Sequence, residues 1–245
     1  MIFLDDVTFG YGEKPVLQNA TLRIAADERV AILGGSGEGK TTILKLILRL
    51  IRPDSGRVSI DGIDITDMTE EELREIRRKF SIVFQEGALF DSLSVKENVA
   101  FCLREFSKMS EEQIDAKVHE LLGVVGVEQA IDLMPDELSG GMHRRVAIAR
   151  SLAAFEPKML LFDEATTGLD PINAEKICVL INQLCKEGTG MILVTHKVID
   201  AIRVAGRFLF LLNGRIVFDG DKHALLGSDN PEIVEFLNEF RMDVK

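Results

Sequence analysis

The stretch Gly34-Gly35-Ser36-Gly37-Glu38-Gly39-Lys40-Thr41 decides the fold class of this chain. It matches the phosphate-binding loop pattern GxxxxGK[ST], with an apolar run before it and a helical pattern after it. Such a loop wraps a phosphate with consecutive backbone N–H groups, and the positive end of the following helix attracts the same anion. Lys40 is expected to reach the β- and γ-phosphates, and the Thr41 hydroxyl to ligate Mg²⁺. We therefore expect a bound nucleotide to contact Gly34, Gly35, Ser36, Gly37, Glu38, Gly39, Lys40, Thr41 and Thr42.

Short β-rich runs alternate with amphipathic helices on both sides of this loop, a pattern typical of an α/β fold. The expected strands are 2–9, 21–24, 28–33, 57–60, 81–84, 158–162, 191–195, 207–212 and 215–218. The last two flank Asn213-Gly214, a strong hairpin signal. The expected helices are 41–51, one after the capping residue Thr69, one from Asp170-Pro171 to a stop at Gly188, and 231–241.

Residues 87 to about 155 have a different pattern, because helix starts follow one another without a convincing strand between them. Ser94 and Ser110 open capping boxes, and a third helix is expected after Ser139. This pattern predicts a helical insert within an α/β core.

The composition excludes several classes of protein. The longest uninterrupted apolar run, 208–212, is far shorter than the ~20 residues of a membrane-spanning helix, and the N-terminus lacks the features of a signal peptide. The net charge of −11 disfavours nucleic acid as a partner. The three cysteines, Cys102, Cys178 and Cys185, show neither CxxC pairing nor metal-ligand spacing, so we expect them to act as small apolar residues in a reducing cytosol.

Two carboxylates follow the apolar strand at 158–162. Asp163 suits a water-mediated contact to Mg²⁺ at the end of a strand, and Glu164 suits a base that polarises the attacking water. By themselves the two residues could be an ordinary exposed acidic pair. Together with the phosphate-binding loop they predict the hydrolytic half of a nucleotide site.

The segment Leu138-Ser139-Gly140-Gly141-Met142 resembles the LSGGQ signature of ABC ATPases, and 144–150 is also similar to that family. The resemblance covers residues 2 to about 220 and implies an ATPase that binds ATP and Mg²⁺. It also implies a head-to-tail homodimer, in which Ser139, Gly140 and Gly141 of one copy contact the nucleotide on the P-loop of the other. The sequence departs from the family in three places: Met142 replaces Gln, Ala165 replaces Pro, and Lys197 replaces Asp.

Further family positions follow from the same resemblance. It implies that Tyr11 stacks on adenine, that Gln85 contacts Mg²⁺ and water, and that Asp170 lies in the loop that communicates across the dimer. His196 matches the switch histidine that holds the γ-phosphate, whereas the other histidines (His119, His143 and His223) have no such placement. The implied catalytic residues are Glu164, His196, Lys40 and Gln85, and the implied Mg²⁺ ligands are Thr41, Gln85 and Asp163. Packing of Tyr11 on the surface is the alternative for that residue.

The fold implied is a single ABC nucleotide-binding domain over residues 1–245. It consists of a RecA-like P-loop core (1–86 and 156–245), an N-terminal antiparallel β subdomain and a helical subdomain at about 87–155.

Three segments, 84–93, 133–142 and 170–172, resemble the Mla/Mce lipid-transport group. That resemblance implies transport of phospholipids or related hydrophobic molecules. The implied partners are an integral membrane permease, an MCE-type lipid-binding protein and a small accessory subunit, with the chain peripheral on the cytoplasmic face of the inner (plasma) membrane. Ala88, Leu89 and Phe90 would fit a docking surface or, alternatively, a buried core. An ATPase of a polar-nutrient importer, a soluble non-transporting ABC ATPase and a P-loop kinase stay open as alternatives.

Overall fold

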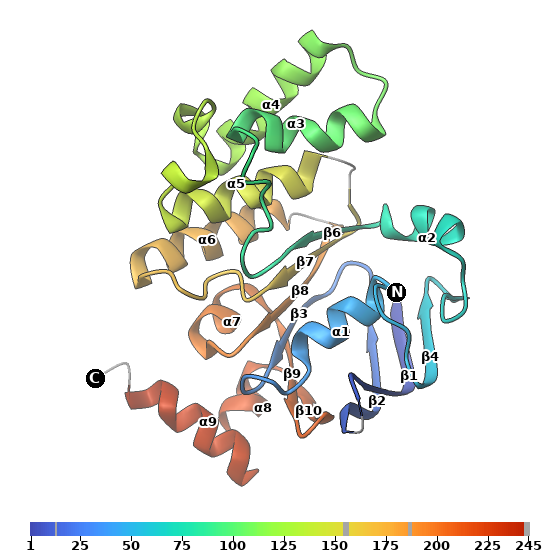
Figure 1. Cartoon of the computed structure of the whole chain (residues 1–245). Helices are drawn as coiled ribbons and strands as arrows, with labels where there is room; N and C mark the ends of the chain where they lie inside the picture. The colour runs from blue at the N-terminus through green and yellow to red at the C-terminus, as the bar shows by residue number, and fades with distance from the viewer. Residues whose placement is uncertain (13, 154–156, 186–187, 243–245) are drawn as a thin grey trace.

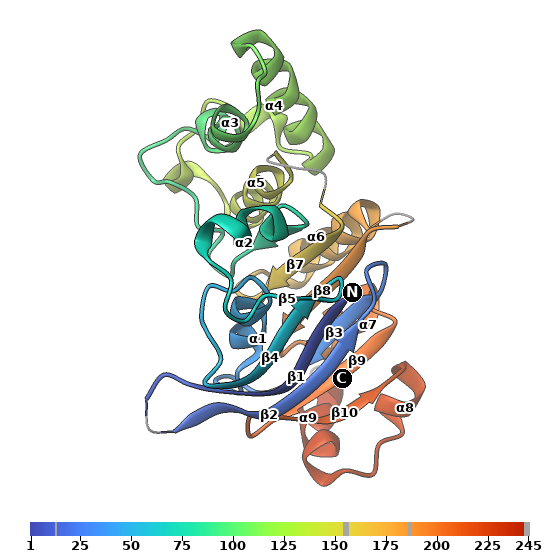
Figure 2. The same cartoon turned by 90° about the vertical axis from the view of Figure 1, so that its right-hand side faces the viewer.

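Two β-sheets form the centre of the chain, and helices cover the larger one (Figures 1 and 2). The computed structural model describes residues 1–12, 14–153, 157–185 and 188–242, with side chains up to 238. The smaller sheet is antiparallel and has the order β2-β1-β4-β5. Its strands are β1 (Ile2–Gly10), β2 (Pro15–Ile24), β4 (Ser55–Ile60) and β5 (Ile63–Asp64).

The larger sheet has the order β10-β9-β3-β8-β7-β6, and all of its strands except β10 run parallel. Every residue of β7 and β8 is buried, which explains why these strands are continuous apolar runs without alternation. A tight turn joins β9 to β10, with positive φ at Asn213 (49°) and Gly214 (72°), as the hairpin signal predicts. The strands are β3 (Arg29–Leu33), β6 (Phe80–Val83), β7 (Met159–Asp163), β8 (Gly190–Thr195), β9 (Arg207–Leu212) and β10 (Arg215–Gly220).

Three helices make up the insert, which lies at the top of Figure 1: α3 (Val95–Phe106), α4 (Glu111–Val125) and α5 (Gly140–Ala153). The capping boxes predicted at Thr69, Ser94 and Ser110 are all present. The other helices are α1 (Lys40–Ile47), α2 (Glu70–Arg77), α6 (Pro171–Leu184), α7 (Val198–Val204), α8 (Lys222–Leu226) and α9 (Pro231–Met242). Short 3₁₀ turns lie at Glu128–Ala130 and Pro135–Glu137.

Three apolar clusters fill the spaces between these layers. One joins the antiparallel sheet to α1 and the central strands, and a second joins the helical insert and α6 to the opposite face. The third lies under α7, α8 and α9. The α/β fold with an antiparallel β subdomain and a helical insertion is thereby confirmed. Among the described residues, no helix combines the length and the apolar character that crossing a bilayer requires.

Several expected boundaries are wrong. The helix expected over 41–51 ends at Ile47, and Arg49 adopts a positive φ of 52°. The helix expected to stop at Gly188 ends at Leu184. The strand expected over 21–24 begins at Pro15. Helices α7 and α8 were not expected from the sequence.

Candidate active site

The carboxyl ends of three adjacent parallel strands bring the predicted site residues together. β3 leads into the P-loop, β7 ends at Asp163 and is followed by Glu164, and β8 ends at Thr195 before His196. In parallel sheets these ends form the usual ligand-binding edge. Strand pairing places β8 between β3 and β7, so the phosphate-binding and acidic motifs meet although 123 residues separate Lys40 from Asp163.

The backbone of the P-loop explains two of its glycines. A Cβ on Gly34 would lie 2.4 Å from the carbonyl oxygen of Leu211 in β9, so only glycine fits there. Gly39 precedes α1 with a φ of 102°, a conformation that residues other than glycine rarely adopt. The loop is therefore held against the central sheet at its start and turned sharply into α1 at its end.

Lys40 is only 6% exposed and folds back over its own loop. Its Nζ donates to the carbonyl oxygens of Gly34 (2.9 Å) and Gly35 (2.8 Å). The same ammonium lies 3.5 Å from a carboxylate oxygen of Glu164. These contacts keep the cation at the centre of the loop, where a phosphate would be received.

Thr41 and Asp163 are joined directly. The Thr41 hydroxyl donates to Asp163 Oδ1 at 2.9 Å, and Asp163 is 3% exposed. Burial, followed by the charge on Glu164, raises the pKa of Asp163, whereas the Thr41 hydrogen bond and Lys40 act in the opposite direction. A hydroxyl and a carboxylate thus converge at the first turn of α1.

Glu164 is the most connected carboxylate in the site. Its Oε2 accepts from the hydroxyls of Thr167 (2.8 Å) and Thr195 (3.2 Å), and His196 Nδ1 lies 3.1 Å from Oε1. Burial raises the pKa of Glu164, but the hydrogen bonds from His196 and Thr167 and the nearby positive charges outweigh burial and lower it. The carboxylate is therefore held ionised and aimed between Lys40 and His196.

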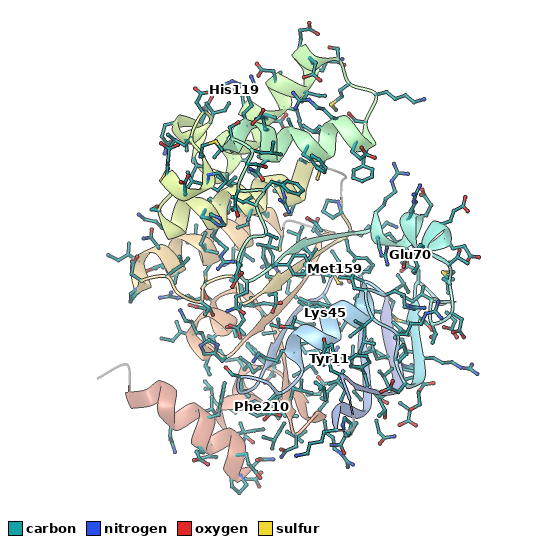
Figure 3. The ribbon with its side chains drawn as sticks, in the orientation of Figure 1. Tyr11, Lys45, Glu70, His119, Met159 and Phe210 are labelled. Atoms are coloured by element: carbon teal, nitrogen blue, oxygen red, sulfur yellow. The ribbon has the colours of Figure 1, made fainter. Side chains whose placement is uncertain are left out.

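Tyr11 lies outside this cluster, beside α1, where Figure 3 shows it next to Lys45. Its side chain is 63% exposed and its ring stands edge-on to Phe9. Lys45 Nζ donates to the Tyr11 hydroxyl at 3.4 Å. The aromatic face is consequently open to a ligand near the P-loop helix, although Phe9 gives it a packing role as well.

Gln85 follows β6, the edge strand next to β7, and its side chain is exposed. Two arginines of α5 hold the segment around it. Arg144 Nη1 donates to the carbonyl oxygen of Phe84 at 2.8 Å, and Arg150 Nη1 to that of Ala88 at 2.6 Å. The helix that follows Ser139 is thereby fixed to the loop that carries Gln85.

The structure does not bring Ser139 to the P-loop of its own chain. Ser139 directly precedes α5, and its Oγ accepts from the N–H of Met142 at 3.3 Å. It lines a surface cavity with Gly141, Arg145, Asn173 and Lys176, and none of residues 34–42 lines that cavity. Asp170 lies nearby, because it caps α6 through the N–H groups of Ile172 and Asn173. A Cβ on Gly141 would lie 3.3 Å from the side chain of Asn173.

A family model described as ABC transporter matches residues 17–167, which include the P-loop, the segment at Ser139 and the acidic pair. The chain belongs to the ABC transporter family. It is thus an ATP-binding cassette that hydrolyses ATP, as the resemblance implied.

Several curated relatives cover almost the whole cassette. The intermembrane phospholipid transport system ATP-binding protein MlaF of Haemophilus influenzae is 38% identical over 97% of this chain and 90% of its own length. Protein TRIGALACTOSYLDIACYLGLYCEROL 3 of Arabidopsis thaliana is 41% identical over 94% of this chain and 71% of its own length. A probable ribonucleotide transport ATP-binding protein, mkl, of Mycobacterium tuberculosis is 38% identical over 98% of this chain and 67% of its own length.

A solved ATP-binding cassette, dimeric and in a post-hydrolysis state with ADP and Pi bound, superposes on this chain with a TM-score of 0.82. It is 36% identical, and the match covers 90% of this chain and 98% of the solved one. The dimer and the bound ADP and Pi are properties of that structure.

The sequence did not reveal some contacts that shape the ABC site. The Glu38 carboxylate accepts from the backbone N–H of Asn213 in the β9–β10 turn, which lies 175 residues away. The side chain of Glu38 is therefore tied to the hairpin, and only its backbone is left to face a phosphate. Thr167 and Thr195 were also missed, although their position beside Glu164 and His196 in the sequence was a usable signal.

Proposed function

We propose that this chain powers an ABC transporter for phospholipids or related hydrophobic molecules, acting as a head-to-tail homodimer on separate membrane subunits. The observation that carries the proposal is the division of the site into two surfaces. Lys40, Asp163, Glu164 and His196 form one cluster, whereas Ser139 lies on another surface of the same chain. A second copy in the opposite orientation would bring its Ser139 to the first copy's cluster.

Within this proposal each side chain has a distinct task in hydrolysis. Lys40 leaves its carbonyl partners to bind the β- and γ-phosphates, and Tyr11 stacks on the adenine. Glu164, ionised by its surroundings, accepts a hydrogen bond from the attacking water and orients it. His196 of the same chain and Ser139 of the partner subunit donate to the γ-phosphate, where negative charge spreads in the transition state.

The donor set fits Mg²⁺, which prefers hard oxygen ligands. Thr41 Oγ1 and Asp163 Oδ1 lie 2.9 Å apart at the N-terminal end of α1. Gln85, just after the end of β6, offers an amide oxygen. When bound, Mg²⁺ would neutralise charge on the phosphate oxygens. Thr41 and Gln85 would hold it directly, and Asp163 through water.

The lipid substrate is supported by relatives, because proteins named for phospholipid transport are 37–38% identical over 97% of this chain. In this proposal the chain lies at the cytoplasmic face of the inner (plasma) membrane. It is held there by its partners, which are a permease, an MCE-type lipid-binding protein and a small accessory subunit. A groove between α2, β6, α3 and α5 offers a docking surface beside Gln85. Next to it Ala88 and Phe90 are exposed and Leu89 is partly buried, so the docking interpretation of this segment fits two of the three residues.

Glu164→Gln tests the hydrolytic assignment. The amide cannot accept a proton from water, so kcat should fall by about a hundredfold or more, while ATP still binds. Nucleotide-trapped dimers should then be seen by size-exclusion chromatography. Glu120→Gln, at an exposed glutamate on α4 paired with Lys117, is the matched control. Unchanged turnover in Glu164→Gln would refute the assigned role.

The substrate is tested by purifying the chain with its membrane partners in detergent and identifying the bound molecule by mass spectrometry. A phospholipid is the expected result. A bound ribonucleotide or amino acid would contradict the lipid assignment, and the first of these would fit the mycobacterial relative.

A further inference from the structure

The turn at 164–169 joins the proposed base, Glu164, to the segment that caps α6. Glu164 has a positive φ of 49°, an unfavourable conformation for a residue with a side chain. Within the turn the N–H of Thr167 donates to Glu164 O (3.1 Å), and the N–H of Leu169 donates to Thr166 O (3.2 Å). Strained backbone of this kind persists only where contacts from outside fix it.

Lys197 supplies such a contact. Its Nζ donates to the carbonyl oxygen of Thr166 at 2.9 Å, in the middle of the turn. One turn of α7 further on, the buried carboxylate of Asp200 accepts from the Thr166 hydroxyl at 2.6 Å. The start of α7 therefore holds Thr166 by its backbone and by its side chain.

The same segment also reaches the carboxylate of Glu164. The Lys197 N–H donates to Thr195 Oγ1 at 3.0 Å, and that hydroxyl donates to Glu164 Oε2 at 3.2 Å. His196, between these two residues, contacts Glu164 Oε1. Residues 195–200 thus hold both the side chain of Glu164 and the backbone turn that carries it.

Lys197 stands where ABC ATPases usually have an aspartate, and a carboxylate could not donate to the Thr166 carbonyl. We propose that Lys197 is a positioning residue for ATP hydrolysis, whose ammonium fixes the turn at 164–169 and so keeps Glu164 beside His196. This inference rests on the proposed role of Glu164. The ammonium of the lysine contacts the Thr166 carbonyl, so it acts on Glu164 through the turn.

Lys197→Met, which keeps the length of the side chain and removes the donor, tests this inference in the full chain. A misplacement of about 1 Å can lower a rate about a hundredfold. A smaller shift of the base should therefore lower kcat about tenfold, while KM for ATP stays within about twofold of the parent. In the nucleotide-free protein, the amides of Thr167 and Leu169 should exchange hydrogen faster than in the parent.

Lys79→Met is the matched control, because Lys79 is also half-buried, donates to Asp61 at 2.7 Å and lies far from the site in the fold. It should lose stability without a change in kcat or in exchange at 164–169. A parental kcat in Lys197→Met, a loss expressed in KM alone, or unchanged exchange in the turn would each overturn the inference. The exchange measurement needs no turnover, so it tests whether Lys197 fixes the turn separately from whether Glu164 is the base.

Discussion

Replacing Thr41 with Val should lower the free energy of unfolding of the nucleotide-free protein, by an amount that depends on pH. Valine keeps the shape of threonine but cannot donate to Asp163 Oδ1, which now receives that hydrogen bond at 2.9 Å. A hydrogen bond to a charged group contributes about 1.5–3 kcal/mol, and Asp163 is too buried for water to replace it. We therefore expect a loss of about 2 kcal/mol in the free energy of unfolding at pH 8.

The sign of the pH dependence follows from the raised pKa of Asp163. Burial, with Glu164 beside it, already favours the protonated acid, and removing the Thr41 donor raises the pKa further. The variant therefore takes up a proton at a higher pH than the parent, which relieves the unpaired charge. The difference in unfolding free energy between the parent and the variant should be fully present at a pH well above the raised pKa of Asp163. It should disappear as the pH falls toward the ordinary pKa of 3.8.

Urea unfolding at a series of pH values, without nucleotide or Mg²⁺, measures this difference. Thr42→Val is the control, since Thr42 is buried in the same helix but is not bonded to Asp163. Its effect should not vary with pH. A Thr41→Val penalty that is equal at pH 5 and pH 8, or absent at both, would show that the hydroxyl does not support the ionised carboxylate.

Two further outcomes are expected away from the nucleotide. Burial raises the pKa of the Cys178 thiol to about 12, so the thiolate needed for reaction is scarce at pH 8. Ellman's reagent should leave Cys178 unmodified in the native protein and modify it in urea, and rapid native labelling located by mass spectrometry would contradict this. Ser110→Ala removes the cap of α4 and should cost about 1 kcal/mol by thermal unfolding, without a change in ATPase rate.

The sequence predicted those features that depend on short, contiguous patterns. Capping boxes, the Asn213-Gly214 turn and the P-loop each contain their physical cause within a few residues, and each is present in the structure. The early end of α1 has a different cause. Arg77 donates to the carbonyl oxygens of Leu48 (2.9 Å) and Arg49 (3.1 Å), which replaces the hydrogen bonds that a longer helix would have made.

The same reasoning explains the error at α6 and the contacts missed in the site. Arg29 donates to the carbonyl oxygens of Asn182 and Cys185, from 153 and 156 residues away, and so caps the helix before Gly188. The bond between Glu38 and Asn213 likewise joins segments at opposite ends of the chain. No local pattern carries such information, because these partners meet only once the sheet has formed.

Arg144 and Arg150 connect α5 to the Gln85 loop at two points, one on each side of that glutamine. With both ends attached, the loop cannot slide along the helix, and a displacement of one must be followed by the other. A rotation of the three-helix insert would therefore shift the amide of Gln85 relative to β7. The two guanidinium groups thus couple the position of the three-helix insert to the position of Gln85 at the edge of the larger sheet.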